Sequence, residues 1–81
     1  MGNLELQGEL ALLRRKDMDL EIKADAKVRA VKQIFSRGAV SCPVEELDVE
    51  GAASLIADLI EIKGEKIRNE GTIKRIEKEL A

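Results

Sequence analysis

Apolar residues recur along the first half of the chain at the spacing of one helix face. The series advances in steps of three or four residues and contains one charged position: Leu6, Leu10, Leu13, Asp17, Leu20, Ala24, Val28, Val31 and Phe35. Neither proline nor glycine occurs between residues 9 and 37. Gly38 then follows Arg37, a pattern typical of a helix C-terminus. The pattern predicts a helix over about residues 4–37.

The second half of the chain carries a regular heptad pattern with two polar interruptions. Its steps alternate between four and three residues: Leu55, Leu59, Ile62, Lys66, Asn69, Ile73, Ile76 and Leu80. Asp48 is a candidate N-cap, and Glu50 places a negative charge in the first turn, where the helix dipole favours it. These features predict a second helix over about residues 48–80.

The segment SCPVEELD, residues 41–48, contains the only cysteine and the only proline of the chain. Pro43 disfavours a helical conformation at Cys42, so one helix cannot run through into the next. We expect a corner over residues 38–47, with one short helical turn after Pro43 and with Val40, Val44 and Leu47 packed over Phe35. Cys42 as a reactive thiol is the alternative interpretation, although no histidine is available to lower its pKa.

Two helices of similar length joined by a short corner predict an all-α antiparallel hairpin that forms one domain. If facing residues have numbers that sum to about 83, as a-to-d pairing in an antiparallel coiled coil allows, Asp17 faces Lys66 and Leu20 faces Ile62. Asp17, Lys66 and Asn69 would then form a buried polar layer. In the alternative arrangement, Asp17 and Lys66 point outward at the edge of the seam.

A second stripe of small and apolar residues follows the opposite side of residues 48–80. Its members are Ala53, Ala57, Ile60, Gly64, Ile67 and Gly71, with Ile56 beside them. Two interior glycines each cost about 1 kcal/mol relative to alanine, which indicates a benefit such as close helix contact. We therefore expect a homodimer that forms a four-helix bundle through this interface. The alternative is an exposed surface that contains glycines by chance.

Composition narrows the classes of function. Charged residues make up 37% of the 81 residues and aromatic residues 1%, a mixture typical of long helices. The chain has no histidine and a single cysteine, and it contains no glycine-rich phosphate-binding motif, so we expect no catalytic centre, cofactor or metal site. The net charge of −2 gives no general attraction to nucleic acid or to anionic membranes. Without a membrane-spanning run or a signal peptide, a cytoplasmic protein is expected.

The corner and the start of the second helix carry a family resemblance. A charged helix, then residues 43–48 (PVEELD), then Ala52 and Ala53 leading a long helix, resemble small helical-hairpin proteins encoded in Mu-like prophages. The resemblance implies a phage or prophage origin and brings no active site with it.

Two functions follow as hypotheses, and an enzyme is disfavoured because no catalytic constellation is present. The favoured hypothesis is a non-catalytic interaction module that self-associates and presents its charged faces to a host or phage protein. The alternative is a nucleic-acid-associated accessory or regulatory protein that uses Arg14, Arg15, Lys32 and Arg37 after dimerisation has brought them together.

Overall fold

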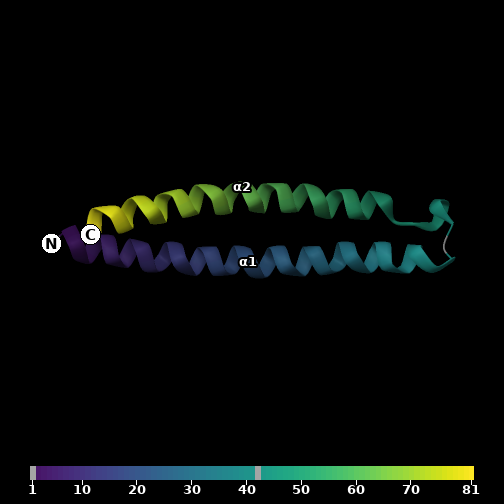
Figure 1. Cartoon of the computed structure of the whole chain (residues 1–81), viewed down its shortest axis with the longest axis horizontal. Coiled ribbons are helices and arrows are strands. Elements are labelled where there is room, and N and C mark those ends of the chain that lie inside the picture. The colour runs from purple at the N-terminus through teal and green to yellow at the C-terminus, as the bar shows by residue number, and fades with distance from the viewer. Residues whose placement is uncertain (1, 42) are drawn as a thin grey trace.

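The computed structural model describes residues 2–41 and 43–81, with side chains at residues 3–36 and 43–81. Its elements are helix α1 (Gly2–Ser41), the short 3-10 turn η1 (Val44–Glu46) and helix α2 (Val49–Leu80). The two long helices run antiparallel and pack along their length, so the start of α1 lies beside the end of α2 (Figure 1). The molecule measures 62 × 15 × 15 Å. The prediction of an all-α helical hairpin is confirmed.

Helix α1 extends further than its sequence pattern predicted. It continues through Gly38 and ends at Ser41, so the expected end at Arg37 is wrong. Glycine within a helix costs about 1 kcal/mol but does not by itself stop the helix, whereas proline restricts the residue before it. The last helical residue is two positions before Pro43. Proline, rather than glycine, therefore coincides with the end of this helix.

The corner forms the expected short helical turn. Pro43 is extended at φ −61° and ψ 150°, and its carbonyl oxygen accepts a 2.9 Å hydrogen bond from the Glu46 amide. The Leu47 amide donates to the Val44 carbonyl at 3.2 Å. The expected apolar plug is wrong, because the Val44 and Phe35 side chains are both exposed. Cys42 and the side chain of Val40 lie outside the described residues.

Helix α2 begins as its sequence predicted. The Asp48 carboxylate accepts a 3.0 Å hydrogen bond from the Gly51 amide, and the Asp48 carbonyl accepts one from the Ala52 amide at 3.1 Å. The Asp48 side chain thus satisfies the Gly51 amide, which has no partner inside the helix. Glu50 lies in the first turn, as expected.

The seam between the helices keeps a regular heptad spacing on α1. Its buried and half-buried positions are Leu6, Leu10, Leu13, Asp17, Leu20, Ala24, Lys27, Val31 and Ile34, with Ala30 beside them. Val28 and Phe35 were expected in this seam but are exposed. Two paired helices keep the 3.5-residue repeat, and two consecutive steps of four residues would move the stripe away from the partner.

Candidate functional site

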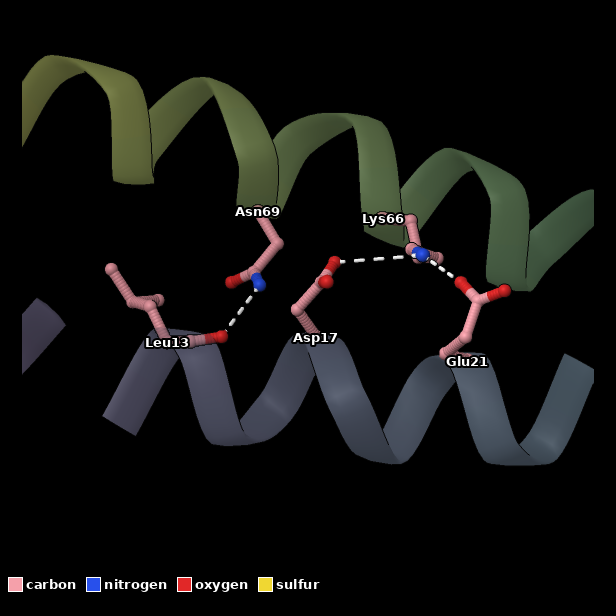
Figure 2. A network of polar contacts seen from close by, with 5 residues as sticks. All are labelled: Leu13, Asp17, Glu21, Lys66 and Asn69. Atoms are coloured by element: carbon pink, nitrogen blue, oxygen red, sulfur yellow. Dashed lines mark hydrogen bonds and ion pairs between the residues drawn. The ribbon is translucent and has the colours of Figure 1, made fainter. Parts of the chain in front are cut away.

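The centre of the hairpin contains a polar layer within the apolar seam (Figure 2). The Lys66 ammonium lies 3.7 Å from Asp17 Oδ1 and donates a hydrogen bond to the Glu21 carboxylate. The Lys66 and Asp17 side chains are 27% and 32% exposed, so the layer is half-buried rather than fully buried. The structure thus brings Asp17 and Lys66 together, as pairing at a sum of 83 predicted, and Leu20 and Ile62 are both buried.

Lys66 is shared unequally between its two carboxylate partners. Asp17 Oδ1 is buried, and no hydrogen-bond donor of the described residues reaches it. Its ion pair with Lys66, at 3.7 Å, is longer than a hydrogen bond. Glu21, one turn along α1 and more exposed, holds the direct hydrogen bond. Attraction from Lys66 therefore offsets only part of the cost of placing the Asp17 carboxylate at the seam.

The hydrogen bond to Glu21 raises the pKa of Lys66 above its ordinary value. Desolvation acts in the opposite direction and lowers it, while the charges of Asp17, Glu21 and Glu70 raise it further. The ammonium form is therefore favoured in the folded chain.

Asn69 is the one buried polar residue among the described side chains, at 6% exposure. Its Nδ2 donates a 2.8 Å hydrogen bond to the Leu13 carbonyl oxygen of the opposite helix (Figure 2). A buried asparagine that finds its partner in only one alignment is a means of fixing the register of paired helices. The three residues predicted as a polar layer thus occupy neighbouring levels of the seam.

The ion pair between Lys27 of α1 and Asp58 of α2 was not predicted from the sequence. Lys27 Nζ lies 2.9 Å from Asp58 Oδ2, and both side chains are partly exposed. Lys27 occupies the heptad position that the sequence pattern predicted for Val28. A strict seven-residue count from Leu13 and Leu20 would have identified it. The long aliphatic part of lysine can lie along the seam while its ammonium remains near water.

The outer face of α2, defined here as Ala53, Ile56, Ala57, Ile60, Gly64, Ile67 and Gly71, lies away from α1. Ile56, Ile60 and Ile67 are 44%, 67% and 60% exposed. The two glycines, which have no side chain, leave gaps beside these isoleucines. A Cβ at Gly64 would meet only Arg68 Nη1, at 3.4 Å, and one at Gly71 would meet nothing within 4 Å. The residues predicted as an interface therefore form an uncovered apolar face in the single chain.

The same side of α2 changes character towards its C-terminus. Beyond Gly71, exposed cations follow the stripe at Lys74, Arg75 and Lys78, and Glu50 lies near its other end. At 100° per residue, Glu50 and Arg75 fall on the same flank of the stripe. The outer face of α2 is therefore apolar in its first two thirds and basic at its end.

Helix α1 has exposed apolar residues that the sequence analysis did not identify. Leu4, Met18 and Ile22 lie on the side of α1 that faces away from α2, and Leu12 is exposed beside them. Leu4 and Met18 are fourteen residues apart, and Met18 and Ile22 are four apart. Ala11 lies on the same side between Leu4 and Met18, but Arg15 interrupts the series, so these residues do not form a continuous apolar stripe. This face is shorter and less regular than the outer face of α2.

Within the described residues, no pocket and no group of metal-ligating side chains is found. Neither α1 nor α2, over the part described, has a stretch that is both long and apolar enough to span a membrane. Comparison of the chain with protein-family models, curated proteins and solved structures finds no match.

Proposed function

We propose that this helical hairpin is a non-catalytic protein–protein interaction module that self-associates through the outer face of α2. The observation that carries the proposal is the uncovered row of Ile56, Ile60 and Ile67 on the side of α2 that faces away from the interhelical seam. Contiguous exposed apolar surface of this kind is typical of interaction sites. A homodimer would contain four helices, two from each chain.

The thinness of the hairpin supports the same proposal. Only one layer of side chains separates α1 from α2, and the long axis is about four times the other two. Full burial of an isoleucine contributes about 1.5–3 kcal/mol, and the three isoleucines on the outer face of α2 are each at least 44% exposed. Association through this face would supply a second apolar layer on the free side of α2.

Sedimentation equilibrium on the full chain tests the proposal. We expect a homodimer at tens of micromolar, and replacement of Ile60 by glutamate should shift the population to monomer. A matched change at an exposed α1 position, Ile22→Glu, should leave the mass unchanged. A monomeric wild-type protein at these concentrations would contradict the proposal.

Nucleic-acid association is the second candidate, and one contact weakens it. Arg14 Nη2 already pairs with Glu77 Oε2 of α2 at 3.1 Å, which neutralises one of the cations it would require. Arg15 and Lys32 are exposed, and the side chain of Arg37 lies outside the described residues. A DNA gel shift that weakens with added salt would favour this candidate over the first.

A phage or prophage setting and a cytoplasmic location belong to the same proposal. They rest on the resemblance of the corner, residues 43–48, to hairpin proteins of Mu-like prophages and on the presence of a single cysteine. The charged outer faces of the dimer would contact a host or phage protein. Affinity capture with the wild-type dimer, compared with the Ile60→Glu variant, would identify a partner that requires the assembled form.

A further inference from the structure

Resting on the proposed self-association, we infer that two copies pair α2 against α2 in antiparallel orientation, centred at the level of Ile62. The occupant of the outer face is therefore the same face of a second copy. Shape and charge along this face both carry the inference.

The steps between successive residues of the outer face are the same when counted from either end. From Ala53 to Gly71 the steps are four, three, four, three and four residues. Consider an antiparallel pair in which the numbers of the two residues that face each other sum to 124. Each facing pair then contains at least one small residue: Ala53 with Gly71, Ala57 with Ile67, and Ile60 with Gly64. The exposed isoleucines of one copy then fill the space that alanine or glycine leaves on the other.

The charges at the two ends of the face are complementary in the same alignment. Residues on the same flank face each other in an antiparallel pair with two-fold symmetry. Glu50 and Arg75 share a flank, and their numbers sum to 125. Antiparallel pairing therefore places Glu50 of each copy near Arg75 of the other, so the dimer contains this ion pair twice.

Parallel pairing lacks both advantages. It places Ile60 against Ile60 and Gly64 against Gly64, which alternates crowded levels with empty ones. It also brings Lys74, Arg75 and Lys78 of the two copies together, so six cations would lie at one end. Like charges at close range oppose association. Shape and charge thus favour the same orientation.

Antiparallel pairing of the two α2 helices determines the shape of the assembly. The outer face lies about 160° around α2 from the seam with α1, at 100° per residue. The four helices would therefore form a row, with the two α2 helices in the middle and one α1 at each side. The two corner segments, one from each copy, would lie at opposite ends of the assembly along the direction of the helix axes.

Disulfide cross-linking in a Cys42→Ser background tests the orientation. A disulfide requires Cα atoms within about 7 Å. In the antiparallel pair, Ala53 of one copy lies about 27 Å along the axis from Ala53 of the other but directly opposite Gly71. We expect a mixture of the Ala53→Cys and Gly71→Cys variants to form a disulfide-linked dimer on oxidation, and neither variant alone to do so.

Charge exchange provides an independent measurement. Glu50→Arg or Arg75→Glu alone should each raise the dimer Kd about tenfold, because each lost pair occurs twice, and the double exchange should restore it. Cross-linking of Ala53→Cys alone would overturn the antiparallel orientation and leave self-association intact. A dimer that neither cross-links nor responds to charge exchange would overturn the inferred face. A wild-type monomer would instead contradict the proposed function itself.

Discussion

Lys66 occupies a seam position where a uniform heptad repeat would have leucine or isoleucine. Its ammonium lies between Asp17, one atom of which is buried, and Glu21, which is exposed. An apolar residue at position 66 would leave the Asp17 carboxylate at the seam without its cation. A residue that appears unfavourable in the pattern of one helix is thus required by a residue of the other.

The raised pKa of Lys66 predicts a loss of stability at alkaline pH. Because the folded pKa lies above the unfolded value of about 10.4, the stabilisation is fully present below that pH and disappears as the pH rises through the folded pKa. The Tm of the wild type should therefore fall relative to that of Lys66→Met as the pH is raised above about 10.4. A constant difference between wild type and Lys66→Met would contradict this assignment.

Substitutions at Asn69 test separately how this residue affects the stability of the hairpin and the register of its two helices. Asn69→Ala removes the hydrogen bond to the Leu13 carbonyl and leaves a gap, so we expect a loss of about 1–2 kcal/mol in the free energy of unfolding. Asn69→Leu fills the seam with apolar volume and should be neutral or stabilising by about 1 kcal/mol, with less uniform register. Urea titrations followed by circular dichroism measure both. A large loss in the leucine variant would show that the hydrogen bond, rather than the packing, dominates at this position.

At the scale of the elements, the N-terminus of α2 depends on two residues together. Asp48→Ala should lower the free energy of unfolding by about 1 kcal/mol, while Asp48→Asn should retain most of it. A Cβ at Gly51 would overlap the Asp48 carboxylate, so Gly51→Ala should also destabilise although alanine is the better helix former. Thermal melts of the three variants measure these effects. A stabilised Gly51→Ala would mean that the cap is dispensable.

The hairpin, the Asp48 cap and the short turn after Pro43 were all predictable from the sequence, since each depends on local chemistry. The seam near Lys27 was not predicted correctly. Apolar residues at 28 and 35 looked like better seam positions than Lys27 and Ile34, although a strict heptad count from Leu13 and Leu20 leads to positions 27 and 34. Asp58, which holds Lys27 in place, is distant in sequence and invisible to the periodicity of α1.

The candidate site was also predictable only in part. Pairing the two stripes brought Asp17 and Lys66 together, but it did not identify Glu21, which accepts the hydrogen bond from Lys66. Glu21 lies beside the seam rather than in it, so a search restricted to seam positions omits it. Lys66 can reach Glu21 because its side chain is long enough to extend one turn along the opposite helix from Asp17.

At the scale of the whole molecule, the hairpin has little interior. Among the described side chains, the buried apolar residues are Leu10, Leu20, Ala52, Ile62 and Ile76. Small single-layer structures are marginal alone, and association stabilises the folded state by mass action. The Tm should therefore rise with protein concentration from micromolar to hundreds of micromolar. For Ile60→Glu it should be lower and independent of concentration, and a concentration-independent Tm in the wild type would contradict self-association.

Gly64→Leu should change the stability in opposite directions when the outer face of α2 is covered and when it is free. Within one chain a Cβ at this position meets only the flexible end of Arg68, so Gly64→Leu should stabilise an isolated hairpin by somewhat under about 1 kcal/mol. In the paired assembly the leucine must collide with the opposing helix, and the dimer should dissociate or shift register with a lower Tm. Gly8→Leu is the matched control, because a Cβ at this exposed glycine of α1 meets nothing within 4 Å, and the change should stabilise in either case. We expect destabilisation at Gly64 alone, measured by thermal melts with sizing in parallel. A raised Tm with unchanged mass in both variants would mean that the outer face of α2 lies in water.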